Sequence, residues 1–407
     1  MVESVQGRAE RVRDAHADRS GQSPSTRRAR VAISGVFAVH GAVYGTFATR
    51  IPWIADRLHL SPGHLGIALI APALGAFVGM PFSGRIIHRI GGKRATRLLL
   101  TAWCVAGALP PFAPNFGVLV LFLGLFGLTS GMADIAMNAQ AIPVEKQVGK
   151  SIMSGLHGMW SVGGLVGSGI GAAAAHANVD ARLHLGLMAA VLIMTGLLAT
   201  AYLPRNQAAA DEPAPPHFTL PPRAVWAIGL LAFGAIFAEG ASADWCAVYL
   251  KRVLGAEPGT AAAAYSAFAF TMALTRFGGD FAVRRFGTAV TVRLSGVIGT
   301  AGALLVVFTH TQLLGIAGFA LIGLGIAAVV PLVFAAAGHA DAHPARAIAG
   351  VATIAYGAGL AAPGIIGGIA TASSLRVSFG VVAVLVALVA FGSRSLPPSA
   401  NTTTSRE

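Results

Sequence analysis

Charged residues are scarce in this chain: only 11% of its 407 residues are Asp, Glu, Lys or Arg, while 55% are hydrophobic. A soluble globular domain carries about 25% charged residues, so this composition excludes an ordinary water-soluble fold. Cysteine is scarce as well, because Cys104 and Cys246 are the only two and both fall within or beside apolar stretches. They provide neither a disulfide framework nor the spacing of a metal site. We therefore expect no metal and no cofactor.

Apolar stretches long enough to cross a bilayer take the place of polar surface. A membrane-spanning helix needs about 20 predominantly apolar residues. A membrane β-barrel would instead show segments of about 10 residues with alternating hydrophobicity, whereas the run from Leu119 to Leu128 is apolar throughout. The sequence predicts an all-α membrane protein with twelve transmembrane helices. The predicted spans are 31–50, 62–82, 96–113, 117–140, 151–175, 183–203, 223–243, 260–280, 290–309, 312–335, 346–370 and 375–393.

The basic residues predict the orientation of these spans. Cytoplasmic loops carry the excess of Lys and Arg, and a cytoplasmic N-terminus places 23 of the 29 basic residues inside. Both termini are therefore predicted to be cytoplasmic, in the inner membrane of a bacterium, since abundant Ala and a preference for Arg over Lys are typical of GC-rich bacterial genomes. The six basic residues that this orientation leaves outside are Arg50, Arg57, Arg182, Lys251, Arg252 and Arg376.

The formal net charge of +13 would also suit a nucleic-acid-binding protein. Here, however, the excess lies on loops that flank the predicted spans, where anionic lipids of the inner leaflet attract it. We therefore expect no nucleic-acid partner. The expected partners are the lipid bilayer, a small-molecule substrate and protons, and the chain is expected to act as a monomer.

A polar segment rich in proline divides the spans six and six. We predict a disordered cytoplasmic tail over 1–30, an N-terminal six-helix bundle over 31–203, a cytoplasmic linker over 204–222, a C-terminal six-helix bundle over 223–394 and a second cytoplasmic tail over 395–407. The N-terminal tail is too long and too polar for a signal peptide.

The two halves repeat each other. The segment from Gly84 to Arg94 follows the second span, and Asp280 to Gly287 follows the eighth, with Gly91 and Gly287 separated by 196 positions. Gly164-Leu-x3-Gly in the fifth span is matched by Gly359-Leu-x3-Gly in the eleventh at an offset of 195. Two parallel repeats with a binding site between them are typical of secondary transporters.

The loop Gly84-x3-His88-Arg89-x-Gly91-Gly-Lys-Arg resembles the signature between helices two and three of the major facilitator superfamily. This resemblance implies two six-helix bundles related by a pseudo-twofold axis, which rock about a central site. His88 stands where the family usually has an acid. The resemblance also implies a set of residues that gate the conformational change: Gly84, Arg85, His88, Arg89, Gly91, Lys93 and Arg94 in the first half, and Arg276, Asp280, Arg284 and Arg285 in the second.

Further segments resemble the fucose-permease-like members and their rhizopine-transport-type subgroup. They are Gly131-x2-Asp134-x3-Asn138 in the fourth span, Ser154-x2-His157-x2-Trp160-Ser in the fifth, Gly240-x3-Asp-Trp245-x3-Tyr in the seventh, and Arg50-Ile-Pro-Trp at the end of the first. The first span has Tyr44 and Thr49 but lacks the embedded acid of fucose permease. Fucose is therefore not inferred as the substrate.

Two embedded acids are the candidates for proton coupling. A charge at the bilayer centre costs at least about 2.5–3.5 kcal/mol, so a function must offset it. Asp134 shares one helix face with Gly127, Gly131 and Asn138, and Glu239 lies deep in the seventh span. A simpler alternative for Asp134 is an ion pair near the membrane surface, and for Glu239 a structural hydrogen bond. For Asp244, a helix-end role is the stronger reading.

Six polar or aromatic residues are candidates for substrate binding. A histidine in a membrane span can hydrogen-bond a substrate hydroxyl, although a backbone carbonyl often satisfies it instead. Aromatic side chains can stack on a ligand ring, but near the ends of spans they commonly form an interfacial belt. The predicted set is Asn138, His157, Trp160, His40, Tyr44 and Trp245.

These features favour a secondary active transporter of a small polar, sugar- or polyol-like solute, which works by alternating access and is coupled to protons. The alternative is a proton-antiport efflux pump for a metabolite, antibiotic or drug. ATP-driven transport is unsupported, because the Walker lysine motif is absent. An intramembrane enzyme is also excluded, since neither a zinc motif nor a catalytic pair with its supporting groups is present.

Overall fold

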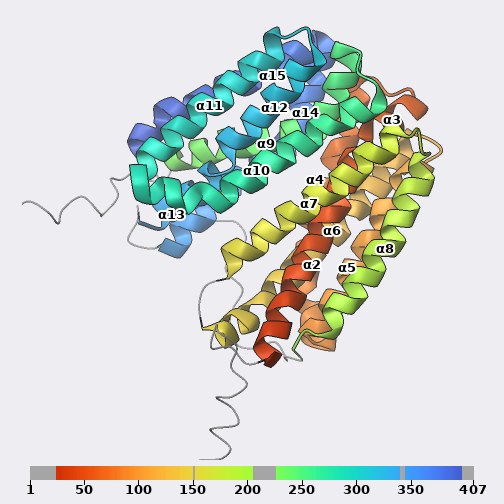
Figure 1. Ribbon diagram of the computed structural model, residues 1–407, viewed down its shortest axis with the longest axis vertical. Helices are drawn as coiled ribbons and strands as arrows, with labels where there is room; N and C mark the ends of the chain where they lie inside the picture. Colours follow the sequence, from red (N-terminus) through yellow and green to blue (C-terminus); the bar gives the residue numbers. More distant parts are fainter. Residues whose placement is uncertain (1–23, 150–151, 205–225, 340–343, 397–407) are drawn as a thin grey trace, which may run out of the picture.

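Every regular element in the residues that the structure describes is a helix. The computed structural model describes residues 24–149, 152–204, 226–339 and 344–396 (Figure 1). The first half holds α2 (Pro24–Ala48), the short α3 (Ile51–Arg57), α4 (Pro62–Ile90), α5 (Gly92–Ala108), α6 (Phe116–Val148), α7 (Met153–His176) and α8 (Ala181–Ala201). The second half holds α9 (Trp226–Leu254), α10 (Pro258–Phe286), α11 (Thr288–Phe308), α12 (Gln312–Ile326), α13 (Val329–His339), α14 (Pro344–Ala372) and α15 (Leu375–Gly392). Short 3-10 turns lie at Pro110–Phe112 and Ser393–Ser395.

Each of the twelve predicted spans coincides with a helical stretch, which confirms the predicted fold class. Nine stretches within the described ranges are long and apolar enough to cross a membrane by length and composition. The other three are α5, which has 17 residues, and α7 and α10, which carry polar side chains between the two bundles described below. Large apolar side chains such as Phe308, Leu313 and Phe391 are more than 70% exposed, as expected for a surface that faces lipid.

The structure corrects several predicted boundaries. The tenth span is two helices, because α12 ends at Ile326 and α13 begins at Val329. Residues 24–30, predicted as disordered tail, form the first two turns of α2. Residues 1–23, nearly all of the predicted linker and residues 397–407 lie outside the described residues.

The internal repeat has a structural counterpart in α4 and α10. Both helices have 29 residues, both begin with Pro-Gly, and their starts are 196 positions apart. Each ends at a glycine with positive φ, +80° at Gly91 and +79° at Gly287, a conformation that only glycine adopts without cost. The glycine amides donate to the carbonyls of Ile87 and Val283 at 2.9 and 2.8 Å. The glycines of the duplicated motif therefore end one helix and start the next.

The helices form two bundles, α2–α8 and α9–α15, which meet at one end of the molecule and diverge toward the other (Figure 1). We call the closed end, where α3 lies beside α9, the α3 end, and the opposite end the α13 end. Helices α4 and α14, and likewise α7 and α10, pack against each other across the boundary between the bundles. The boundary is thus formed by two helix pairs that the internal repeat relates.

Glycines at the α3 end bring the two bundles into backbone contact. A Cβ atom on Gly66 of α4 would lie 2.7 Å from the carbonyl oxygen of Pro363 and 2.9 Å from the Cα of Gly367, both on α14. A Cβ on Gly259 of α10 would lie 2.5 Å from the His176 side chain on α7. Small residues allow such close helix packing in membranes. The contacts of α4 with α14 and of α7 with α10 therefore depend on glycine, which has no side chain.

The first prediction concerns this close packing. Gly66→Val should force α4 and α14 apart at the α3 end, because the obstructing atoms belong to the backbone and cannot rotate away. Gly368→Val is the matched control, since no atom lies within 4 Å of a Cβ placed there. Spin labels on exposed Gln147 of α6 and Val290 of α11 would measure the separation of the bundles at the α13 end by electron–electron resonance. The Gly66 variant should shift this distribution to shorter distances. An unchanged distribution would contradict the assigned role of Gly66.

Candidate functional site

A cavity of about 250 Å³ lies between the two bundles near the middle of the helices. Five helices line it, two from the first bundle (α2 and α7) and three from the second (α9, α10 and α14). The side chains with polar groups in its lining are Tyr44, Trp160, Ser161, Glu239, Tyr265 and Arg276. The remaining lining residues are apolar or glycine: Gly164, Ile236, Gly240, Ala243, Phe268, Ala269, Met272 and Gly359. A site lined from both bundles changes shape when they move.

The guanidinium of Arg276 is the centre of the polar lining. Its Nη2 donates to Glu239 Oε1 at 3.0 Å, and its Nη1 donates to Ser161 Oγ at 2.9 Å. Its Cζ also lies 5.9 Å from the centroid of the Trp160 ring, within the range of a cation–π contact. Glu239 belongs to α9, whereas Ser161 and Trp160 belong to α7, so one side chain of α10 connects the two bundles.

A second polar contact crosses between the bundles through Tyr44. Its hydroxyl, on α2, donates to Asp244 Oδ1, on α9, at 2.9 Å. The Tyr44 ring lies 6.2 Å from that of Tyr265 on α10. Tyr44 therefore places one face in the cavity and uses its polar tip to hold a carboxylate of the other bundle.

His40 lies behind the cavity and supports Trp160. It is 5% exposed, its Nδ1 accepts from Trp160 Nε1 at 3.0 Å, and its Nε2 lies 3.4 Å from the carbonyl oxygen of Ser130. This arrangement assigns the neutral ring with its proton on Nε2, because one nitrogen accepts and the other faces an acceptor. The ring also stacks on Trp103 at 5.2 Å. His40 is therefore placed to hold the Trp160 indole in position.

The predicted site residues fall into two groups. Glu239, Trp160 and Tyr44 line the cavity, and His40 contacts it through Trp160. His157 is exposed on α7 and packs edge-on against Phe37 at 5.4 Å. It does not line this cavity.

Trp245 is completely buried and does not line the cavity. Its Nε1 has no hydrogen-bond partner among the described residues. Its role in binding stays a prediction.

Asp134 and Asn138 interact with each other rather than with the cavity. The Asn138 Nδ2 donates to Asp134 Oδ1 at 3.2 Å and to the Asp134 carbonyl at 2.9 Å, as their shared helix face predicts. The glycines of that face, Gly127 and Gly131, pack against the backbone of α4 at Pro72 and Ala76. Because this face of α6 meets α4, the pair does not appear among the residues that line the cavity.

Most of the predicted gating residues lie at the α13 end. Arg85, His88, Arg89, Arg94, Arg284 and Arg285 are exposed there, and a Cβ on Gly84 would meet no atom within 4 Å. Lys93 Nζ donates to the carbonyl of Ala201 at 2.5 Å and so joins α5 to the end of α8. The side chain of Asp280 lies outside the described residues.

Arg276 is placed differently from the other predicted gating residues, because it lies in the cavity. The signal was present in the sequence: Arg276 precedes the end of α10 at Phe286 by ten residues, which is roughly 15 Å at 1.5 Å per residue. The cavity also includes Ser161 and Tyr265, which the sequence did not place in the binding set, and Asp244 contacts it through Tyr44. Among the described residues, no group of three or more His, Cys, Asp or Glu could hold a metal ion.

Comparisons with known proteins agree with this architecture. A family model described as Major Facilitator Superfamily matches residues 33–361. An uncharacterized transporter of Sinorhizobium fredii, y4wD, is 36% identical over 361 residues, which cover 88% of this chain and 95% of that protein. Membrane protein MosC of Rhizobium meliloti is 28% identical over 358 residues, covering 87% of this chain and 86% of MosC.

Solved structures show the same fold. The nucleoside transporter NupG superposes with a TM-score of 0.70 at 12% identity, over 89% of this chain and 98% of NupG. The transporter FucP in its outward conformation superposes with a TM-score of 0.60 at 16% identity, over 89% of this chain and 97% of FucP. These comparisons confirm the predicted all-helical fold and the resemblance that the sequence motifs indicated.

The second prediction measures the Arg276–Glu239 pair by a double-mutant cycle. Both side chains are about three-quarters buried, with 23% and 27% exposed, so removing one leaves the other charge poorly solvated. Glu239→Gln, Arg276→Gln and the double variant should give a coupling of about 1–3 kcal/mol in the free energy of unfolding.

The pair Asp180 and Arg182 is the matched control for this cycle. Their side chains are 48% and 43% exposed, and an exposed pair of this kind contributes below about 1 kcal/mol. If the two cycles gave equal coupling energies, the central pair would have no special energetic role.

Proposed function

This chain belongs to the Major Facilitator Superfamily, and we propose that it carries a small polar, sugar- or polyol-like solute across a bacterial inner membrane in exchange with protons or together with them. Family membership makes it a multi-pass membrane protein and a secondary transporter with a small-molecule substrate, and not an enzyme. The observation that carries the finer proposal is the cavity between the bundles, with an ion pair at its centre and aromatic rings on its walls.

The lining of the cavity supports a solute that has both hydroxyl groups and an apolar face. Arg276, Ser161 and Tyr44 offer hydrogen-bonding groups, while the rings of Trp160 and Tyr265 offer flat surfaces. Sugar rings and polyols present polar edges and less polar faces, which these two kinds of surface complement. A few convergent polar groups in a mostly apolar pocket are typical of small-molecule sites.

Proton coupling is assigned to Glu239, with Asp134 as a second candidate. Glu239 accepts a hydrogen bond from Arg276 at 3.0 Å, and in this proposal a proton that binds the carboxylate would remove the charge that holds the guanidinium. Arg276 is then free to bind a substrate oxygen instead. Proton binding and substrate binding at Arg276 would be linked in this way, because both act on the same side chain.

The arrangement of the two bundles supports alternating access. They are packed together at the α3 end and diverge at the α13 end (Figure 1). If both termini are cytoplasmic, as the basic residues predict, the α3 end faces outward and this conformation is open to the cytoplasm. Rocking of one bundle against the other would then expose the cavity to the opposite side.

The apolar part of the lining favours a second candidate, export of an amphipathic metabolite or drug. Phe268, Met272 and Ile236 line the cavity together with alanines and glycines, and flexible methionine suits ligands of varied shape. A thermal-shift screen of the purified protein against sugars, polyols and amphipathic drugs separates the two candidates. Stabilisation by drugs alone would replace the sugar-like assignment.

The third prediction tests coupling in proteoliposomes loaded with the solute found in that screen. Glu239→Gln should abolish transport driven by a pH gradient, because the amide cannot exchange a proton. Asp134→Asn should do the same if Asp134 also carries protons. Glu257→Gln is the control, since this exposed acid at the start of α10 does not line the cavity. The coupling assignment would fail if both Glu239→Gln and Asp134→Asn transported at the parental rate with unchanged pH dependence.

A further inference from the structure

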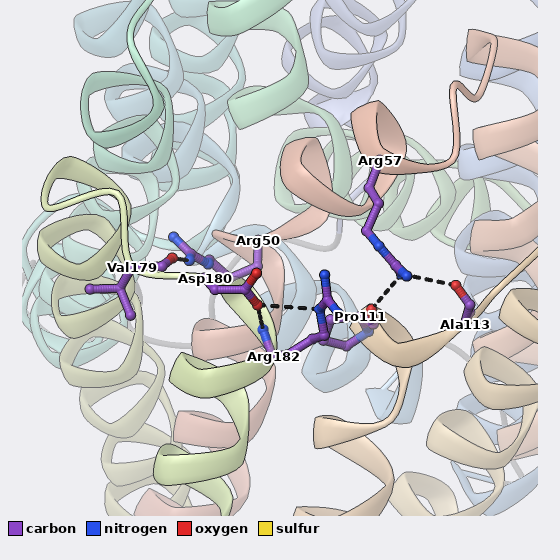
Figure 2. Close-up of polar contacts among 7 residues, drawn as sticks. All are labelled: Arg50, Arg57, Pro111, Ala113, Val179, Asp180 and Arg182. Carbon is purple, nitrogen blue, oxygen red and sulfur yellow. Dashed lines mark hydrogen bonds and ion pairs between the residues drawn. The ribbon is translucent and has the colours of Figure 1, made fainter.

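Five basic residues gather at the α3 end, where the two bundles meet. They are Arg50, Arg57, Arg182, Lys251 and Arg252, which are five of the six basic residues that the sequence assigns to the outer side. Arg57 donates to the carbonyls of Pro111 and Ala113 at 2.7 and 3.0 Å (Figure 2). Arg182 pairs with Asp180 at 3.4 Å. These contacts fix two of the five side chains inside the first bundle.

The two cations of the second bundle share one acid of the first. Lys251, on α9, hydrogen-bonds Asp56 on α3, and Arg252 Nη2 lies 3.8 Å from the other oxygen of the same carboxylate. Arg252 also donates to the carbonyl of Leu60 at 2.9 Å. Asp56 therefore compensates two positive charges, and the junction keeps an excess of positive charge.

Arg50 is the most deeply buried of the five. It is only 2% exposed, and its Nη2 donates to the neutral carbonyl of Val179 (Figure 2). Its Nε is buried and has no hydrogen-bond partner among the described residues. Nor does a carboxylate of the described part of the chain lie within ion-pair distance of it. The Asp180 carboxylate acts on Arg50 only from beyond ion-pair distance and forms its ion pair with Arg182. A closer anion would therefore compensate the buried guanidinium further.

A cavity of about 100 Å³ adjoins Arg50 and lies between the bundles. Arg50, Thr49 and Trp53 line it from the first bundle, and Lys251 and Pro258 line it from the second. Pro258 is the first residue of α10, so the start of that helix, with Glu257 as its N-cap residue, adjoins the cavity. No acidic side chain lines the cavity. A water molecule takes about 30 Å³, so the space admits a small anion with one or two waters.

We propose that this cavity binds a small inorganic anion, of the size of chloride or phosphate, which completes the contact between the bundles at the α3 end. Two cationic side chains line this space, one of them with an unused guanidinium N–H, and no acidic side chain lines it. Because the lining comes from both bundles, the anion binds only when they are together. By linkage it stabilises the conformation closed at the α3 end.

The fourth prediction is a saturable, anion-specific stabilisation of the purified full-length protein. Thermal unfolding is followed while chloride replaces gluconate at constant ionic strength, and phosphate is titrated in a parallel series. The melting temperature should rise and then level off with one of the two anions. Saturation with chloride identifies a halide-sized site, and saturation with phosphate identifies an oxyanion site. A melting temperature independent of both anions would overturn the proposal, because water alone would then fill the cavity.

Neighbouring residues provide the matched variants. Lys251→Gln should raise the half-saturating anion concentration by about tenfold or more, because a charged partner inside the cavity is lost. Arg252→Gln removes the same charge from the same carboxylate, but Arg252 does not line the cavity, so its half-saturation should stay close to the parental value. If the half-saturating concentration rose equally in the two variants, the anion would respond only to the net positive charge of this region. The proposed site would then be refuted.

A second measurement tests the proposal through the conformation of the protein and needs no change at Arg50. In the parental protein with spin labels at positions 147 and 290, the saturating anion should increase the population with separated α13 ends. The increase should disappear in Lys251→Gln. An anion that raises the melting temperature without changing this distribution binds elsewhere, and the cavity assignment would then be wrong.

Discussion

The guanidinium of Arg276 holds the middle of the molecule together, because it contacts groups from both bundles at once. It binds Glu239 of α9 and Ser161 of α7, and it lies beside the Trp160 ring. A cation placed deep among apolar helices is costly, and each of these contacts offsets part of that cost. Any solute that enters the cavity meets a charge that is already engaged, so binding must exchange one set of contacts for another. Such an exchange is how a transporter links what it binds to how its bundles are arranged.

The close packing of the helices around the site depends on glycines, which have no side chain. Glycines at α4 and α14 allow backbone contact, and the turn glycines Gly91 and Gly287 end the paired helices in the same way. The turn glycines belong to the internal repeat, whose two copies have equal length between proline and glycine. The repeat thus supplies the frame, while the polar side chains differ between the halves. The contact between Arg276 of the second bundle and Trp160 of the first is one such difference.

Much of the architecture could be predicted from the sequence, because a run of apolar residues is a local property that lipid converts into a helix. The twelve spans and the paired turns are of this kind, and Glu239 was found because an acid inside such a run stands out. The depth of Arg276 was missed, since it depends on how far α10 continues past the apolar run. That Asp134 does not line the cavity could not be predicted, for another reason. Its contact with Asn138 follows from helix periodicity, but which face of α6 meets α4 is decided by packing between helices distant in sequence.

The two closures at the α3 end differ in their chemistry. Between α4 and α14 the contact is made by glycine and carbonyl atoms, with no formal charge at Gly66, Pro363 or Gly367. Between α3 and α9 it is made by Asp56 with Lys251 and Arg252, whose side chains are between a quarter and a half exposed. Dissolved salt weakens the attraction between partly exposed charges and leaves apolar contact unaffected. Raised ionic strength therefore weakens the ion-pair contact between α3 and α9, while the glycine contact between α4 and α14 keeps its strength.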